Sequence, residues 1–397
     1  VYCMNYPVTV LSVAYFIIST LLLPLMVQAF SCLVAWVISL ISSKMRNKNI
    51  ITMVVSLLFL AAYFYLYSKM GDIISGLIAN GTAIAVAFKK YAFPAYYFGV
   101  GIAEHNLTYL LLYTVCTLAV FELVYAILSR SFRQITTAKK GTARIKYKER
   151  SMHVSSPAAA LLRKDFQHFI GNPMYVLNAW MGEILLVVAC VAMLIKKDIL
   201  TEFLPILNGE GEIMGLILCV ILCGLSCTNL ITAPSISLEG KNLWIAQSIP
   251  VPAGVVLRAK VKLQMLLCIP ITALSALLMG IVLKLELLTL VLAVLVPAAF
   301  NLFTALLGVV VNLHFPKFDY INETVVIKQS MSTMICMFGS MAVVLVLALL
   351  YALLLSASVA PTLFLAVCLV LLVIVCVLMW RYLGHGGSAR FAALQAD

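Results

Sequence analysis

Long apolar runs separated by short polar segments dominate the pattern of this chain. A helix rises about 1.5 Å per residue, so about 20 apolar residues cross a hydrocarbon core of ~30 Å. Residues 8–41 form an apolar stretch, interrupted by Pro24, that is too long for one ordinary span and too short for two. The pattern predicts an all-α fold, a polytopic transmembrane helical bundle with about nine to ten spans. The clear later runs cover roughly residues 50–66, 107–129, 175–195, 213–233, 266–282, 287–311, 330–356 and 361–380.

The composition indicates the same class of protein. Hydrophobic residues make up 64% of the chain, charged residues make up only 11%, and the mean hydropathy is +1.10. Soluble domains are about 25% charged. We therefore expect an integral membrane protein.

The net charge of +12 fits an orientation signal better than a nucleic-acid site. If the basic segment 44–49 is cytoplasmic, alternation of the spans places 21 of the 27 Lys and Arg residues on that side. The positive-inside rule expects this asymmetry. No aromatic residues interleave the charges, as stacking on nucleic acid would require. We expect a cytoplasmic C-terminus, contacts with anionic membrane lipids, and no nucleic-acid partner.

A long basic segment divides the chain into two parts. Residues 130–157 are polar and rich in Ser, and we expect them to form a basic cytoplasmic linker. Residues 158–397 then form a complete six-span transmembrane module, and residues 1–129 form the C-terminal remnant of a first module. The second module opens with an amphipathic helix that lies on the membrane face. Its apolar side is Leu161, Leu162, Phe166 and Phe169, opposite Arg163, Lys164 and His168.

The idea of a partial first module comes from an internal overlay. Residues 23–44 can be laid over residues 296–317, which pairs Pro24 with Pro297, and each segment is followed by a polar turn and two further spans. Under this overlay Val1 lies inside a third span, and the opening spans of the first module are missing.

The stretch "SISLEGKNLWIAQSIPVP" is a polar, helix-breaking insert between two apolar runs. Gly240 permits a backbone conformation that ends one helix, and Pro250 and Pro252 bracket the start of the next. Between them a short helix can lie on the cytoplasmic face. This helix is either a rigid element that transmits a push or an interfacial anchor, with Trp244 in the aromatic belt and Lys241 at the level of the head groups.

Three polar side chains inside the predicted spans are candidates for a substrate pathway. Glu122 and Glu183 lie about 10–12 Å from the nearer interface, where two acids at similar depth could line a polar cavity. Each could instead be neutral, paired with an amide such as Asn178, or turned toward the interface. Asn301 lies nearer the middle of the bilayer, where an amide more often joins helices than binds a ligand.

The remaining patterned segments favour structural roles. Residues 67–106 are apolar but broken by glycines and a proline and rich in aromatics, so we expect re-entrant or interfacial helices, or an aromatic belt. Cys219, Cys223 and Cys227 share one helical face. This spacing could hold a soft metal, but small residues at such spacing typically pack helices closely, so we expect no metal site.

Signatures of catalytic sites are missing from the sequence. It contains no G-x-x-x-x-G-K-[ST], no H-E-x-x-H and no G-x-S-x-G, and its five histidines are scattered. We therefore expect no catalytic residues and no enzyme activity, and we expect another polypeptide to supply energy for any work that the chain does.

Three separate stretches resemble the permease subunits of bacterial ABC-2-type exporters, particularly the large two-module permeases of Gram-positive bacteria. They are "LLRKDFQHFIGNPMYVLNA", "SISLEGKNLWIAQSIPVPAGVVLRAKVKLQ" and "LHFPKFDYINETVVIKQSMS", in the expected order across residues 161–333. The chain departs from the family pattern at its N-terminus, where the first module lacks its opening spans and its own docking loop.

The resemblance implies a membrane subunit of an exporter in the bacterial cytoplasmic membrane. It would pair with a separate ABC ATPase, in two copies, that binds ATP and Mg²⁺, so this chain itself would hold no cofactor. The resemblance also implies a docking element for the ATPase at residues 238–250. Carried onto this sequence, its residues are Leu238, Glu239, Gly240, Lys241, Asn242, Trp244 and Pro250.

Two other functions stay open at this point. A membrane-embedded enzyme acting on lipid or peptide substrates would need polar catalytic residues at one depth, and the sequence offers only Glu122 and Glu183. A non-catalytic membrane assembly or immunity factor would share the appearance of a permease.

Overall fold

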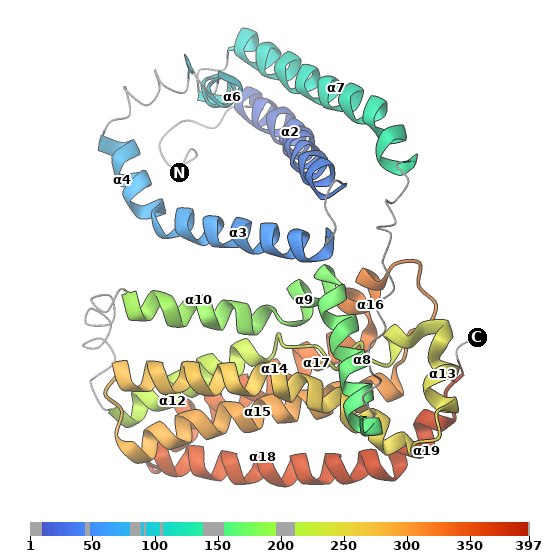
Figure 1. Cartoon of the computed structure of the whole chain (residues 1–397). Coiled ribbons are helices and arrows are strands. Elements are labelled where there is room, and N and C mark those ends of the chain that lie inside the picture. Colours follow the sequence, from blue (N-terminus) through green and yellow to red (C-terminus); the bar gives the residue numbers. More distant parts are fainter. Residues whose placement is uncertain are drawn as a thin grey trace. The chain divides into compact units, whose positions relative to one another are not determined.

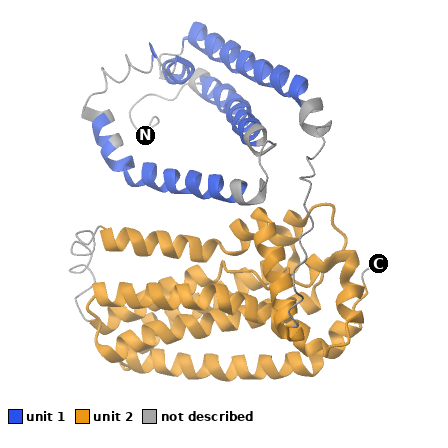
Figure 2. Ribbon diagram, in the orientation of Figure 1, with its two compact units in different colours: residues 1–149 blue, residues 150–397 orange. Residues whose placement is uncertain are grey.

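The computed structural model describes residues 10–43, 48–79, 89–90, 93–103, 106–137, 155–195 and 211–395. These described residues form helices and no strand, which confirms the predicted all-α class. The chain divides into two compact units, residues 1–149 and 150–397 (Figure 2). Most of the predicted linker at 130–157 lies outside the described residues.

Unit 1 is built around one long pair of helices. From Val10 on, the predicted apolar stretch forms a single helix, α2, with Pro24 inside it, and α2 packs along α7. Tyr15 and Ala29 of α2 and Tyr113 and Val124 of α7 are buried. The helices of the unit are α2 (Val10–Ser43), α3 (Lys48–Ser68), α4 (Met70–Ala79), α6 (Phe93–Ala103) and α7 (Leu107–Thr137) (Figure 1).

The predicted re-entrant or interfacial segment contains two short helices. With 10 and 11 residues, α4 and α6 are each too short to cross a bilayer. The aromatic residues of α6 pack on α7: Tyr97 stacks on Tyr109 at 5.8 Å, and Phe98 meets Tyr113 edge to face at 5.4 Å. Residues 80–88 between these helices lie outside the described part.

Unit 2 is a helical bundle centred on α15, which packs against α12, α14, α17 and α18. The buried share of α15, 50%, is the largest among the long apolar helices of the structure. The elements of the unit are α8 (Pro157–Gly171), α9 (Pro173–Ala179), α10 (Met181–Ile195), α12 (Gly211–Ser226), the 3₁₀-helix η1 (Ser237–Asn242), α13 (Leu243–Ser248), α14 (Ala253–Val282), α15 (Leu287–His314), α16 (Glu323–Gln329), α17 (Met331–Leu350), the π-helix η2 (Tyr351–Leu355), α18 (Pro361–Gly384) and α19 (Gly386–Ala392).

The lengths of the helices make the chain a multi-pass membrane protein. Among the described residues, six helices are long and apolar enough to cross a membrane, and a bent pair, Thr52–Ser68 with Met70–Gly76, can form a seventh span. Helices α10 and α12, with 15 and 16 residues, are apolar but shorter than these spans, so the described residues give six or seven candidate spans, fewer than the nine to ten predicted.

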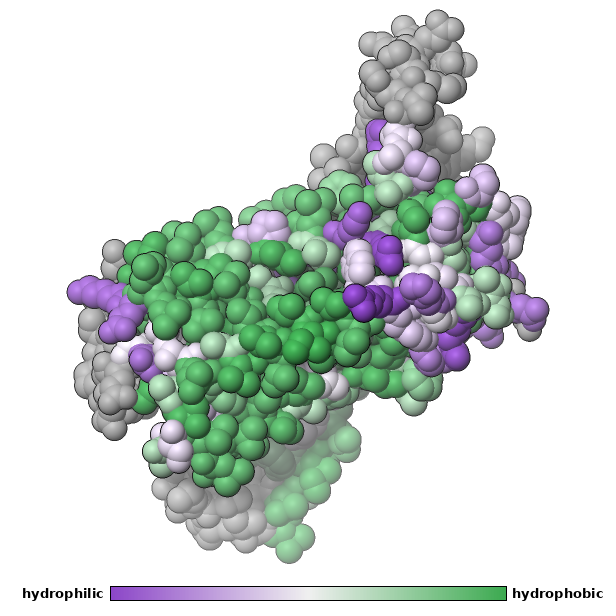
Figure 3. All heavy atoms as spheres, turned by 90° about the horizontal axis from the view of Figure 1, so that it is seen from below, coloured by the Kyte–Doolittle hydropathy of each residue, from purple (hydrophilic) through white to green (hydrophobic). Residues whose placement is uncertain are grey.

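The surface of unit 2 fits lipid contact. Figure 3 shows a broad apolar face, with hydrophilic residues gathered mainly toward the end where α13 and α19 lie. Val370, Leu371, Ile374 and Leu378 of α18 are half or more exposed. An apolar surface this extensive is typical of a protein embedded in a membrane.

The prediction of one helical span over residues 213–233 is wrong in its second half. Helix α12 ends at Ser226, and residues 227–236 are largely buried but not helical. Side chains from neighbouring helices replace the missing helical hydrogen bonds: Gln264 accepts from the N–H of Thr232 at 3.0 Å, and Asn312 accepts from the N–H of Ile236 at 2.8 Å. Buried polar partners of this kind allow irregular backbone at membrane depth.

Two further boundaries differ from the prediction. The span expected at 175–195 is interrupted at Trp180, between α9 and α10. Helix α14 begins at Ala253 rather than near residue 266. Its first turns carry Lys260, which is only 3% exposed and points into the bundle.

The amphipathic helix expected at the start of the second module is confirmed as α8. Leu161 and Phe169 are buried, whereas Arg163, Lys164 and His168 are exposed. Its apolar side packs on α14, so α8 is bound to the bundle by protein contacts.

Candidate functional site

The predicted docking element folds into two short helices, η1 and α13, and η1 contains a kink at Gly240. Gly240 has φ +52° and ψ −136°, a conformation that residues with a Cβ rarely adopt. A Cβ at Gly240 would lie 2.8 Å from the hydroxyl oxygen of Tyr320. The special backbone conformation predicted at this glycine is therefore confirmed, but the preceding membrane helix, α12, already ends at Ser226.

The docking element has an inner and an outer side. Leu243 is 1% exposed and packs in an apolar cluster with residues of α14, α15 and α18, such as Leu257. On the outer side, Trp244 is 63% exposed and Ile245 is 46% exposed. The other predicted docking residues divide in the same way: Leu238 and Gly240 are buried, Glu239 is nearly so, and Lys241, Asn242 and Pro250 are exposed.

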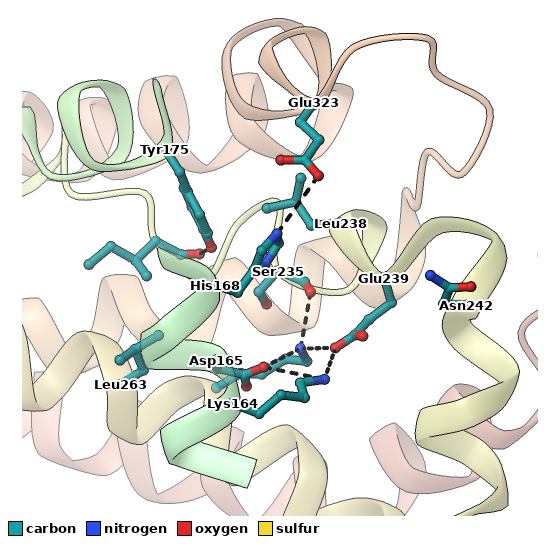
Figure 4. Close-up of a pocket in the computed structure, with 12 residues that line it drawn as sticks. Lys164, Asp165, His168, Tyr175, Ser235, Leu238, Glu239, Asn242, Leu263 and Glu323 are labelled. Atoms are coloured by element: carbon teal, nitrogen blue, oxygen red, sulfur yellow. Dashed lines mark hydrogen bonds and ion pairs between the residues drawn. The ribbon is translucent and has the colours of Figure 1, made fainter. Parts of the chain in front are cut away.

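Glu239 joins the docking element to two other helices. Its Oε1 atom lies 2.7 Å from the Nζ atom of Lys164 on α8 and 2.7 Å from the Nζ atom of Lys260 on α14 (Figure 4). Lys260 also donates to the carbonyl of Ser235 at 3.1 Å and lies 3.6 Å from Asp165 Oδ1. We call Lys164, Asp165, Glu239 and Lys260 the ion cluster.

The charges of the ion cluster fix the ionisation state of Glu239. Burial by itself raises the pKa of this carboxyl, but the nearby cations Lys260 and Lys164 outweigh it and lower the pKa from 4.5 to about 2. Glu239 is therefore a carboxylate at neutral pH, and the ion cluster holds two cations and two acids close together.

The ion cluster forms part of the lining of a cavity of about 350 Å³. On its other side His168 Nε2 lies 3.8 Å from Glu323 Oε1, and the Tyr175 hydroxyl donates to the carbonyl of Ile231 (Figure 4). Next to the cavity, Asn172 donates to Glu323 Oε2. The cavity therefore brings together α8, α9, η1, α14 and α16, which lie far apart in the sequence.

A second set of contacts binds the docking element to the C-terminal helix. The side-chain amide of Gln247 donates to the carbonyl of Phe391 at 2.8 Å and to that of Leu394 at 2.9 Å. With the ion cluster and the buried face of α13, these bonds make the docking element a rigid part of unit 2.

The candidate pathway residues have different surroundings. Glu122 is exposed on α7 of unit 1, whereas Glu183 of unit 2 is 1% exposed. Glu183 Oε1 accepts from Asn229 Nδ2 at 2.9 Å and from Thr272 Oγ1 at 2.8 Å. Asn301 joins the same group, because it donates to Thr272 Oγ1 at 3.0 Å.

Sequence reasoning missed several residues of these sites. Lys260 was expected in a loop, and Asn229 was placed in an apolar span without a role. Asn178, proposed as a partner of Glu183, instead donates to the carbonyl of Met174. The sequence does show polar residues within apolar stretches, which could have indicated these sites. Their hydrogen-bond and ion-pair partners cannot be found from the local pattern, because they lie 21 to 89 residues away in the sequence.

The three cysteines on one face of α12 and its extension are buried in unit 2. Cys219, Cys223 and Cys227 belong to an apolar cluster with residues such as Leu186 and Phe300. The described part of the chain contains no group of three or more His, Cys, Asp or Glu that could hold a metal ion.

Comparison with known proteins identifies a family for this chain. A family model described as "Putative ATP-binding cassette" matches residues 75–381, which is most of the chain. No curated protein and no solved structure matches.

Proposed function

Because the chain belongs to the family described as "Putative ATP-binding cassette" and is a multi-pass membrane protein, we propose that it is the permease subunit of an ABC exporter of the ABC-2 type. The family and the apolar helices make it a membrane component of an ABC transporter. The proposal adds the role of this component. It moves a substrate through the membrane and takes its energy from a separate ATPase.

The observation that carries the proposal is the construction of the docking element. Its outer side presents Trp244 and Ile245. Its inner side is fixed to unit 2 by the buried side chain of Leu243, by the hydrogen bonds of Gln247 and by the ion cluster. Large exposed aromatics on a fixed support are typical of protein interfaces. An anchor that only rested in the membrane would not need ion pairs to two separate helices.

The sequence supports a separate source of energy. The chain contains no P-loop motif, although its family description names the ATP-binding cassette. We propose that a partner ATPase, in two copies, binds ATP and Mg²⁺ and docks on residues 238–250. The element would then face the cytoplasm of a bacterial cell, in agreement with the distribution of Lys and Arg.

The ion cluster suggests how force is transmitted. Closure of the ATPase on ATP would press on α13, and Glu239 would pass the displacement to α14 through Lys260 and to α8 through Lys164. Tilting of α14 against α15, its main packing partner, would change access to the interior of the bundle.

Affinity purification from the native membrane tests the proposal. We expect a vanadate-sensitive ATPase to co-purify and to be lost on Trp244→Ala, because an interface hot spot contributes about 2 kcal/mol or more, roughly 30-fold in affinity. Leu378→Ala is the matched control: Leu378 is 60% exposed, close to the 63% of Trp244, but lies on α18.

A protein that purifies alone, in mild detergent and with its fold intact, would contradict the proposal and favour an assembly or immunity factor. Equal retention of the ATPase by both variants would contradict docking at α13 and leave the ATPase partner in place.

A further inference from the structure

Two interrupted helices meet inside unit 2 beside Glu183. The α9–α10 segment is broken at Trp180, and α12 gives way to non-helical backbone after Ser226. The segments approach very closely, since a Cβ at Gly182 would lie 2.2 Å from the carbonyl oxygen of Leu225. In membrane transporters, sites for coupling ions and protons are typically formed where helices are interrupted.

A polar cluster fills this junction. Asn229 Nδ2 donates to Glu183 Oε1 and, at 3.3 Å, to Asn301 Oδ1. Asn301 Nδ2 donates to Ser226 Oγ and to Thr272 Oγ1, both at 3.0 Å, and Thr272 donates in turn to Glu183 Oε1. These contacts converge on one oxygen of Glu183. Its other oxygen, Oε2, is buried and has no hydrogen-bond partner among the described residues.

The carboxyl group also has no counter-charge. Glu183 takes part in none of the ion pairs between described residues. An ionised acid at membrane depth is costly unless a counter-charge neutralises it. Glu183 lies in the first turn of α10, whose dipole offsets only a small part of that cost. The buried carboxylate therefore needs a bound cation, either a proton or a metal ion, at its second oxygen, Oε2.

The surroundings of Oε2 favour a proton over a metal ion. The amide and hydroxyl donors of the cluster gather at Oε1, and Oε2 has no hydrogen-bond partner among the described residues. An alkali ion needs several oxygen ligands around it, whereas a proton needs only Oε2. We propose that Glu183 is a proton-binding site of the membrane module, with its proton on Oε2 in the described conformation.

The site exchanges one proton, –COOH ⇌ –COO⁻ + H⁺, when the bundle rearranges and Oε2 gains access to water. Cys268 on α14 interacts electrostatically with Glu183. A thiol carries no positive charge at any pH, so Cys268 supplies no counter-charge to this carboxyl group.

Infrared spectroscopy of the full-length chain in lipid nanodiscs tests protonation without a substrate or a partner. At neutral pH we expect the carbonyl band of a protonated carboxylic acid. It is lost in Glu183→Gln, an isosteric change that keeps an acceptor for Asn229 and Thr272. It remains in Glu122→Gln, which removes the other acid from an apolar helix.

A second variant separates this assignment from a folding defect. Thr272→Val leaves the carboxyl group in place but removes one donor to Oε1, so the Glu183 band should persist and move to higher wavenumber. A spectrum that is the same in wild type and Glu183→Gln would overturn the proposal. A band that appears only after Na⁺ is replaced by choline would overturn it in favour of an alkali-ion site.

The use of the proton during a transport cycle rests on the proposed function. In the complex with an ATPase, Glu183→Gln should remove the pH dependence of coupled ATP hydrolysis between mildly acidic and mildly alkaline pH. Unchanged pH dependence would overturn the role in the cycle, whereas no coupled hydrolysis in wild type would be a failure of the exporter proposal.

Discussion

Glu239→Gln is the most informative single substitution in the ion cluster. It keeps the shape of the side chain and removes its negative charge from Lys260, which is 3% exposed. The pKa of Glu239 is lowered from 4.5 to about 2 because Lys260 and Lys164 outweigh the effect of burial. A shift of that size corresponds to about 3 kcal/mol, and the side chain is only 15% exposed, so solvent screens little of it.

The sign of the pH dependence follows from the lowered pKa. The unfolded chain takes up the proton first as the pH falls, so the stabilisation is complete above about pH 4.5 and is lost as the pH approaches about 2. At neutral pH we expect Glu239→Gln to lower the unfolding free energy by about 3 kcal/mol. Near pH 3 the difference from wild type should shrink to about 1.5 kcal/mol.

Equilibrium unfolding of the purified chain in mixed micelles, measured at several pH values, checks both numbers. Glu122→Gln is the control, since Glu122 is exposed and should change stability little. A loss that stays the same from neutral pH to pH 3 would refute the electrostatic explanation and indicate a packing effect. No loss at neutral pH would refute the ion cluster itself.

Four further substitutions test neighbouring contacts by the same unfolding measurement. Lys260→Met should cost about 3 kcal/mol or more, because it leaves buried acids unpaired, whereas Lys164→Met, at a side chain 46% exposed, should cost less than about 1 kcal/mol. Gly240→Ala should cost about 1–3 kcal/mol, since φ is +52° there; a neutral result would contradict the strained backbone. Asn312→Ala leaves the N–H groups of the 236–237 backbone without their acceptor and should cost about 2 kcal/mol or more; a cost below 0.5 kcal/mol would show that water replaces it.

The sequence was sufficient for features that depend on local pattern. Apolar length predicts the helices, the alternation of apolar and basic residues predicts α8, and Gly240 predicts the kink in the docking element. Each of these signals lies within a few residues of the structure that it determines. The same glycine marks the kink inside η1, and α13 begins three residues later, at Leu243.

Features that depend on distant partners could not be predicted in this way. Helix α12 ends at Ser226 because Gln264 and Asn312 accept hydrogen bonds from the following backbone, and both lie on other helices. Lys260 is buried because Glu239 and Asp165 come to it from η1 and α8. The hydrophobic pattern around residues 213–233 is the same with or without these partners, so it predicts a continuous span.

The most direct test of the central proposal is a photoreactive amino acid placed at the outer side of α13. We predict that a photocrosslinker replacing Ile245 captures an ATP-binding polypeptide in native membranes, whereas the same group at Leu378 on α18 captures none. Both side chains are exposed in the structure, at 46% and 60%. An ATP-binding adduct from residue 245 alone would establish the docking element. Absence of such an adduct from residue 245, or equal adducts from both positions, would contradict it.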